Sequence, residues 1–333
     1  MSGDEPAVVL PDVQAAANRL AKWEADLDPA QPESSGLRVL AYGEISATLV
    51  IPDPLFAGLV AKRMSGFPSA LAVADYVKLV QGYCEDLARV GLSVVDTLAV
   101  PVERSDRPPV AYLVQPQLSS ELLGNVLLHE VDDATLRVMI RSVLSQVDAV
   151  LASNSESSGL AIDAQMSNWW FGAGADGRPT LVDVGTPFVR RRGKYLMEPR
   201  ILLAAVPPGV RAWYLWRQAG EKYMDDYFDR RLVGLDLLGN FIKEGARERI
   251  PVGVEAVNEW LATGTTLAST TGSGVGEPGG LDAVTEDQVR KYYDDDAATL
   301  ELFLRVRRAD RWFRTKVLRS AYDFVLPGPV QRG

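Results

Sequence analysis

The chain has 333 residues, 47% of them hydrophobic and 24% charged, and a formal net charge of −9 at pH 7. This composition predicts a soluble globular protein large enough for two domains, and the negative charge argues against a general nucleic-acid-binding protein, which needs a basic surface. No apolar run approaches the ~20 residues that span a bilayer, the first residues do not resemble a secretory signal, and Cys84 is the only cysteine, so we expect a cytoplasmic protein without membrane or nucleic-acid partners.

A helix and a small sheet are predicted for the first 64 residues. Apolar residues recur with helical spacing over 12–27 and stop at a segment rich in Pro and Ser, so residues 1–35 form a helical extension. The pattern then changes to the alternation typical of strands. The three expected strands are residues 37–41, 47–51 and 59–64.

Three residues of this sheet suggest a ligand site. Gly43 and Ser46 lie in the turn between the first two strands, where a glycine lets the backbone approach a ligand. Lys62 lies in the third strand, and its neighbour Arg63 would point to the opposite face of the sheet.

A helix and further strands follow. Ser69 can cap a helix over 70–90. Glu85 lies on its polar side, which it shares with Asp75, Lys78 and Asp86. Strands are expected around 93–95 and 110–114, and Gln115-Pro116-Gln117 interrupts the second of these.

The clearest helix pattern comes next, after a short helix near 119–129. Asp132 or Asp133 caps a helix whose apolar residues keep a spacing of about 3.6 as far as Leu151. A loop and a hairpin follow, with strands at 168–172 and 180–183 around a turn at 175–177.

Two short motifs lie in this loop and hairpin. Asp163 and Asn168 fit D-x-x-x-x-N, and Asp183 and Gly185 fit D-x-G. In this order they resemble the protein kinase-like superfamily. The usual H-R-D is replaced by Ala161-Ile162-Asp163 and no A-P-E follows, so the resemblance is closer to the small-molecule antibiotic and choline kinases than to protein kinases.

The resemblance implies an α+β, bilobal fold. Its small lobe, an antiparallel sheet with a helix, would comprise residues 36–114, followed by a hinge at 115–117. The helical lobe would comprise residues 118–333 and contain the catalytic loop.

The resemblance also implies ATP- and Mg²⁺-dependent phosphoryl transfer to a small-molecule hydroxyl. Asp163 would be the catalytic base, and Asn168 and Asp183 would hold the metal. The residues implied in nucleotide binding are Lys62 with Glu85 as its best-placed partner, Gly43 and Ser46 at the phosphates, and Gln115 and Gln117 at the hinge.

The departures from the motif leave two other hypotheses open. One is a catalytically inactive pseudokinase that binds nucleotide or a protein partner, and the other is an α+β interaction protein that binds no nucleotide. A Rossmann fold is rejected because a strand, rather than a helix, follows the G-x-G-x-x-G match at 172–177. His129 is the only histidine and is expected at the surface, so no zinc site is recognisable.

The rest of the chain is predicted to be helical and indicates no single acceptor. The basic run 190–192 favours an anionic acceptor, whereas Asp225, Asp226 and Asp229 favour a cationic one. The basic cluster from Arg305 to Arg319 is interpreted as a solvated helix face. The expected elements are helices near 198–205, 209–230, 231–244 and 253–262, a flexible segment at 264–280, and one or two final helices over 285–309 and 310–325.

Overall fold

The computed structural model describes residues 8–43, 45–172, 178–198, 201, 204, 224–263, 283–319 and 322–325. The predicted turn at 175–177, most of the helices predicted over 198–223 and the flexible segment 264–280 lie outside these residues.

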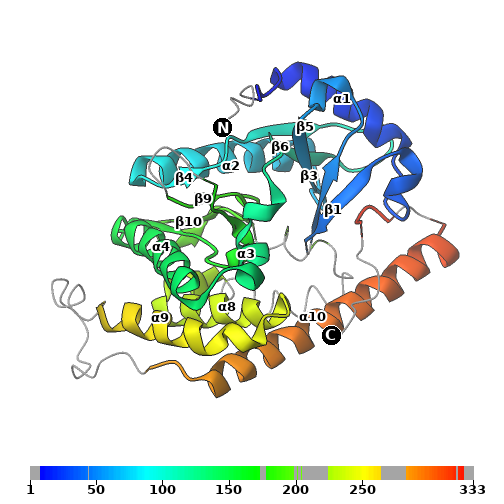
Figure 1. Ribbon diagram of the computed structural model, residues 1–333. Helices are drawn as coiled ribbons and strands as arrows, with labels where there is room; N and C mark the ends of the chain where they lie inside the picture. Colours follow the sequence, from blue (N-terminus) through cyan, green and yellow to red (C-terminus); the bar gives the residue numbers. More distant parts are fainter. Residues whose placement is uncertain are drawn as a thin grey trace.

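The N-terminal part is a five-stranded antiparallel sheet with a helix on each face (Figure 1). The strand order is β1-β2-β3-β6-β5. The strands are β1 (Arg38–Tyr42), β2 (Ser46–Val50), β3 (Leu59–Met64), β5 (Leu98–Val102) and β6 (Val110–Pro116). Successive residues of a strand face opposite sides, so Leu113 packs in the core with α2 (Ala70–Val90), whereas Tyr112 packs in the core with α1 (Val13–Asp26).

The C-terminal part is mostly helical and holds two small three-stranded sheets. Its helices are α3 (Gly124–Glu130), α4 (Asp133–Ala152), α8 (Arg230–Lys243), α9 (Ile250–Thr263) and α10 (Glu286–Trp312). One sheet has the order β11-β10-β7, with β7 (Ser158–Ala161), β10 (Phe188–Arg191) and β11 (Lys194–Tyr195). The other has the order β4-β9-β8, with β4 (Ser93–Val94), β8 (Trp169–Trp170) and β9 (Thr180–Leu181). This two-part architecture confirms the predicted α+β fold class.

The two parts are joined by more than the chain between them. β4, which directly follows α2, pairs in parallel with β9 of the C-terminal part. α10 runs along the base of the molecule, packs on α8, and continues beneath the N-terminal sheet (Figure 1). Among the described residues, none of the helices combines the length and apolar character needed to cross a bilayer.

Several predicted elements are confirmed and two are corrected. The helix caps Ser69 and Asp132 accept the hydrogen bonds expected of them, from Ala72 N at 3.2 Å and Thr135 N at 2.7 Å. β5 was not predicted: it contains Pro101, which a strand tolerates at the edge of a sheet. Of the one or two helices predicted over 285–309 and 310–325, the structure has a single helix, α10, which continues to Trp312 and then into a π-helical turn, Phe313–Val317, whereas residues 322–325 are not helical.

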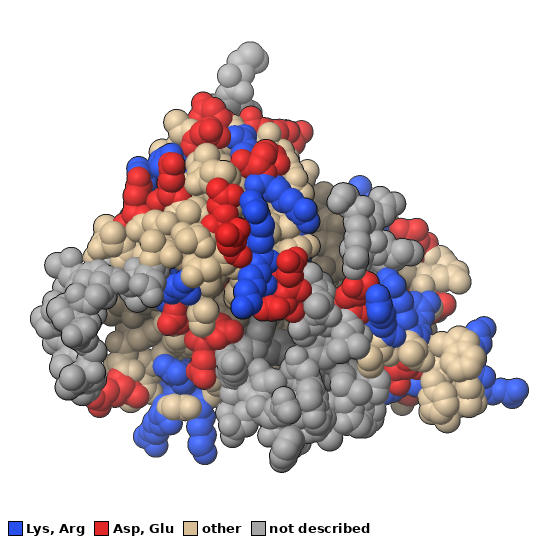
Figure 2. Space-filling view, turned by 90° about the horizontal axis from the view of Figure 1, so that it is seen from below, with Lys and Arg blue, Asp and Glu red and all other residues tan. Residues whose placement is uncertain are grey.

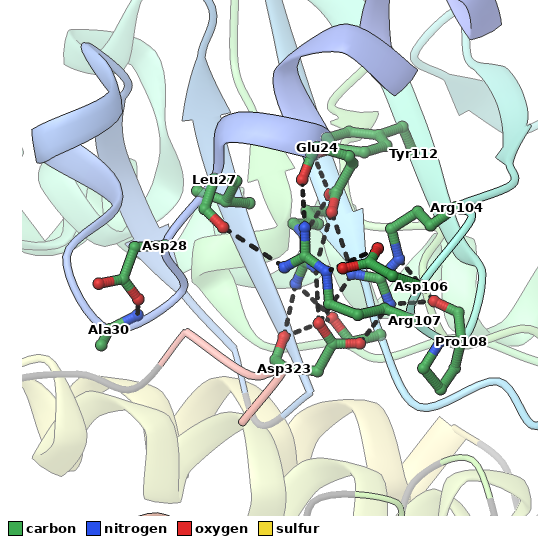
Figure 3. A network of polar contacts seen from close by, with 12 residues as sticks. Glu24, Leu27, Asp28, Ala30, Arg104, Asp106, Arg107, Pro108, Tyr112 and Asp323 are labelled. Atoms are coloured by element: carbon green, nitrogen blue, oxygen red, sulfur yellow. Dashed lines mark hydrogen bonds and ion pairs between the residues drawn. The ribbon is translucent and has the colours of Figure 1, made fainter. Parts of the chain in front are cut away.

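Arg63 lies on the opposite face of the sheet from Lys62, as predicted, in a buried ionic network. Its Nε lies 2.5 Å from Glu24 Oε1 in α1, and its Nη1 donates to the Asp323 carbonyl at 2.7 Å. Arg104 contacts both carboxylates, at 3.1 Å from Glu24 and 2.7 Å from Asp323. Figure 3 shows Glu24, Tyr112, Arg104 and Asp323 pointing toward one another between the sheet, α1 and the C-terminal segment. Two guanidinium groups thus balance two carboxylates inside the N-terminal part.

Candidate functional site

The candidate site begins with an ion pair between the two parts of the molecule. Lys62 of β3 places its Nζ 2.7 Å from each carboxylate oxygen of Asp183, a residue 121 positions later in the chain. The two side chains are 18% and 37% exposed, so the pair lies at an accessible edge of the core. The predicted strand lysine and the predicted D-x-G aspartate are therefore brought together.

The D-x-x-x-x-N loop lies beside this pair. β7 ends at Ala161, and Asp163 Oδ1 then accepts a hydrogen bond from Gln165 N at 2.9 Å. The Asn168 side chain lies near the Asp163 carboxylate and acts, behind larger effects, to lower its pKa, and the Asn168 carbonyl accepts from Val182 N at 2.9 Å. That backbone bond holds the loop against the segment that carries Asp183.

The two aspartates differ in the direction of their pKa shifts. Burial raises the pKa of Asp163 to about 6, and the nearby negative charge of Asp183 adds to the shift. Burial also acts on Asp183, but the Lys62 ammonium outweighs it and holds the pKa of Asp183 below its ordinary value. Two neighbouring carboxyl groups with opposite shifts suit different tasks, one in proton transfer and one as a permanent anion.

Asn168 and Asp183 can serve as metal ligands. Mg²⁺ is commonly held by one or two protein oxygen ligands, together with water and substrate phosphates. If the Asn168 amide nitrogen donates to Asp163, its carbonyl oxygen remains available. Among the described residues, no group of three or more His, Cys, Asp or Glu side chains could hold a metal by itself. The available donors fit Mg²⁺ bound together with a phosphate group.

Gly185 must be small because the ion pair lies against it. A Cβ atom at this position would lie 3.1 Å from Lys62 Nζ and 3.2 Å from Asp183 Oδ1. The Gly185 amide donates to Asp183 Oδ1 at 2.9 Å, and its carbonyl accepts from the Tyr76 hydroxyl at 2.8 Å. The D-x-G segment is thus fixed on both sides.

Glu85, the expected partner of Lys62, is not brought to it. The side chain is exposed, and no carboxylate of α2 forms an ion pair with Lys62 among the described residues. Tyr76 marks the side of α2 that faces the site, and Glu85 follows it by about two and a half helical turns, which places it on the opposite side. Lys62 pairs with Asp183 instead.

The predicted glycine turn between β1 and β2 is present. Gly43 N donates to the Ser46 carbonyl at 2.9 Å. A Cβ at position 43 would lie 2.4 Å from Ser46 Oγ, so a larger residue there would displace the Ser46 hydroxyl. Ser46 is only 8% exposed, and its hydroxyl lies beneath the turn.

The two glutamines of the predicted hinge have different environments. Gln115 lies inside β6, rather than in a linker, and is buried. Its Nε2 donates to Thr97 Oγ1 at 3.0 Å and to the Val182 carbonyl at 3.1 Å, next to Asp183. Gln117 is exposed, and its backbone amide donates to the Gly58 carbonyl at 2.8 Å. Gln115 therefore supports the Asp183 segment, and the amide of Gln117 is already occupied.

Two tyrosines that connect α2 to the site were not predicted. Tyr76 donates to Gly185 O, and Tyr83 donates to Ala161 O at 2.7 Å. Both are buried and lie seven residues apart on one side of the helix. Buried tyrosines usually need a hydrogen-bond partner. Two tyrosines seven residues apart in a predicted helix were therefore the signal from which these contacts could have been predicted.

A lysine near the two aspartates was also missed. On α8, Asp236 accepts from Gln165 Nε2 at 3.1 Å and Asn240 donates to Gln165 Oε1 at 3.2 Å. Lys243 lies on the same side of the helix, seven residues after Asp236. Its charge acts, behind larger effects, to lower the pKa of both Asp163 and Asp183. No motif in the sequence marks this residue.

The basic and acidic runs that favoured opposite acceptors partly pair with each other. Arg190 lies 3.4 Å from Asp225 and 4.5 Å from the ring centre of Phe228. Asp229 accepts from Leu232 N at 2.9 Å and so caps α8. Arg190, Asp225 and Asp229 are therefore already engaged within the protein.

The comparisons with known proteins identify a family but no activity. A family model described as "Family of unknown function (DUF6206)" matches residues 28–311. No curated protein sequence matches the chain.

Two solved structures have low similarity to the chain. For "WaaP in complex with acyl carrier protein" the sequence identity is 14% and the TM-score 0.33, over 78% of this chain and 98% of that one. For the GDP and kanamycin complex of APH(2")-IIia the values are 13% and 0.30, over 68% and 93%. Similarity this low does not by itself support an assignment of fold. The likeness to the protein kinase-like fold comes from the strand order, the position of α2 and the motif geometry of this chain.

Proposed function

The chain belongs to DUF6206, a family of unknown function, and from the geometry of its own site we propose that it is an ATP- and Mg²⁺-dependent phosphotransferase acting on a small-molecule hydroxyl. One observation carries the proposal: Lys62 and Asp183 meet at 2.7 Å from different parts of the molecule, beside the loop of Asp163 and Asn168. Phosphoryl transfer by this superfamily uses a cation at the phosphates, a metal-binding pair and a base in this arrangement.

Each residue has a defined task in the proposed reaction. The acceptor oxygen forms a bond to the γ-phosphorus while the bond from that phosphorus to the bridging oxygen of ADP breaks. The hydroxyl proton passes to Asp163, whose pKa of about 6 leaves it mostly ionised at pH 7. Lys62 neutralises charge on the phosphates. Bound by Asn168 and Asp183, Mg²⁺ would neutralise charge on the transferring group.

Thermal stabilisation by nucleotide tests the binding step. A ligand at about 100 times its Kd should add about 2.7 kcal/mol to the free energy of unfolding. We expect stabilisation by ATP with Mg²⁺ and loss of it in Asp183→Asn. Asp287→Asn is the control, since that carboxylate is 94% exposed on α10. No shift at millimolar ATP would exclude the proposed nucleotide site.

A second candidate is nucleotide binding without transfer, as in a pseudokinase that acts through a protein partner. It is favoured by the pairing of Lys62 with Asp183 instead of a carboxylate on α2. The two candidates differ in one variant. Asp163→Asn should abolish transfer to a panel of hydroxyl acceptors if the protein is an enzyme. A pseudokinase would show nucleotide binding, no transfer by the natural chain and no effect of this substitution.

A further inference from the structure

The end of α10 carries a cluster of exposed apolar side chains. Trp312 is 62% exposed, Phe313 47%, Val317 53% and Leu318 58%. A contiguous patch of exposed apolar side chains indicates a contact surface more often than single exposed apolar residues do. We call residues 308–319 the α10 tip.

The backbone gathers these side chains on one side of the tip. Residues Phe313–Val317 form a π-helical turn, closed by the bond from Leu318 N to Phe313 O at 3.1 Å. A π turn joins residues five apart. Trp312 and Val317 therefore lie one turn apart on the same side of the helix, and so do Phe313 and Leu318. A regular α-helix would distribute the same four residues more widely around its circumference.

The tip is basic in an acidic protein. Residues 308–319 contain five Lys or Arg and one acidic residue, whereas the whole chain has a net charge of −9. That acidic residue, Asp310, pairs with Arg314 at 2.9 Å, and Lys316 and Arg319 are exposed. Figure 2 shows basic and uncharged side chains together at the right-hand edge, where α10 ends.

We propose that the α10 tip docks the protein on an anionic lipid surface. Trp, Phe and Leu beside Lys and Arg form the pattern of segments that lie in a membrane interface, with apolar groups among the acyl chains and cations at the headgroups. The tip projects at the edge of the molecule (Figures 1 and 2), where a fluid lipid layer can surround it. This changes the interpretation of the basic cluster as only a solvated helix face, and it does not depend on the proposed phosphotransferase activity.

Co-sedimentation of the full chain with vesicles tests the proposal. One set of vesicles contains equal parts of phosphatidylcholine and phosphatidylglycerol, and the other contains phosphatidylcholine alone. We expect binding to the mixed vesicles only, weakening as salt is added. Absence of binding to the mixed vesicles at low salt, or equal binding to both sets, overturns the proposal.

Two double variants locate the contact. Trp312→Ala with Phe313→Ala should reduce binding, whereas Leu71→Ala with Val138→Ala removes two residues that are 70% and 63% exposed elsewhere and should not. Lys316→Glu with Arg319→Glu should lower partitioning by at least about 30-fold, since each cation near an anionic surface is worth a factor of about five. Its control is Arg192→Glu with Lys194→Glu. Arg192 and Arg319 have nearly the same left-handed backbone, with φ of 50° and 49°.

Two further results decide whether the tip binds a lipid surface or a second copy of the chain. All variants should unfold at the temperature of the natural chain, because the buried Arg307 and the Asp310–Arg314 pair are unchanged. Tip variants that bind the mixed vesicles as well as the natural chain does overturn the proposal. So does a dimer, seen by sedimentation equilibrium, that the tip substitutions dissociate, because the occupant is then a second copy of the chain.

Discussion

At the scale of single residues, Asp163 and Asp183 show how one side chain type acquires two properties. Both are penalised by burial, and Lys62 at 2.7 Å reverses the balance for Asp183 alone. Asp163 lies near the Asp183 carboxylate, and among the described residues it forms no ion pair with a lysine or arginine. The site therefore holds one carboxylate that stays ionised and one that exchanges its proton near neutral pH.

Asp163→Asn should raise stability at pH 7 while it removes activity. The folded-state pKa of about 6 lies above the ordinary value of 3.8, so the free energy of unfolding falls as pH rises between these values. Removing the charge should restore about 1–2 kcal/mol at pH 7 and little at pH 3. Urea denaturation at both pH values measures this, with Asp287→Asn as the control. A variant less stable than the natural chain at pH 7 contradicts the assigned shift.

The rate of phosphoryl transfer should rise with pH through about 6. The ionised form of Asp163 accepts the hydroxyl proton, so kcat/KM should fall about tenfold for each pH unit below its pKa. Nucleotide affinity over the same range is the internal control, since the lowered pKa keeps Asp183 ionised there. A flat rate profile between pH 5 and 7 would exclude Asp163 as the base.

At the scale of elements, close packing of α3 positions the loop that carries Asp163 and Asn168. Gly124 begins α3, and a Cβ there would lie 2.2 Å from the Met166 carbonyl oxygen. Helix and loop therefore approach more closely than any side chain allows. Met166 lies between Asp163 and Asn168 in the loop, so a displaced α3 would displace the loop.

Gly124→Ala should destabilise the protein by about 1–3 kcal/mol through this overlap. It should also impair transfer more than nucleotide binding, because Asp163 moves with the loop. Gly82→Ala in α2 is the matched control: nothing lies within 4 Å of its added Cβ, so the substitution should stabilise by about 0.5–1 kcal/mol. Thermal unfolding of the two variants checks both signs. Equal behaviour would show that α3 can shift without cost.

Local patterns predicted the elements better than their mutual orientation. Ser69 and Asp132 mark helix starts because capping depends on the next three residues, and both caps are present. The resemblance in motif order placed Lys62 and Asp183 in one site, but it did not predict that they form an ion pair. That Glu85 does not pair with Lys62 could not be predicted, because this depends on which side of α2 meets the sheet, and Tyr76 occupies that side. Lys243 comes from an element without any motif.

At the scale of the whole molecule, the buried network around Arg63 connects the beginning, middle and end of the chain. Glu24 is fully buried, and Asp323 is 17% exposed. Burial alone would raise the pKa of Glu24, but the Arg63 guanidinium and its neighbours hold it below its ordinary value. Asp323 is shifted in the same direction, chiefly by Arg104 acting against burial.

Glu24→Gln should destabilise the protein by about 3–5 kcal/mol, because it leaves Arg63 and Arg104 with too little negative charge. In the natural chain, lowered carboxylate pKa values mean that this contribution is complete above about pH 4.5 and is lost as pH falls below it. Urea unfolding from pH 7 to pH 3 measures both effects. Asp106→Asn is the control, since its carboxylate is 76% exposed. A Glu24→Gln variant of natural stability would show that water reaches the network.

The position of Asp323 also affects the order in which the protein can be completed during synthesis. Domains generally fold from the N-terminus as they leave the ribosome. In this chain β6, the last strand of the five-stranded N-terminal sheet, ends at Pro116. Until Asp323 emerges, Glu24 alone faces two guanidinium groups, and the sheet holds an uncompensated positive charge. The N-terminal sheet is therefore synthesised first, but its ionic network is completed only when Asp323 is added. A fragment ending after β6 should not reproduce the stability that the same residues have in the full chain.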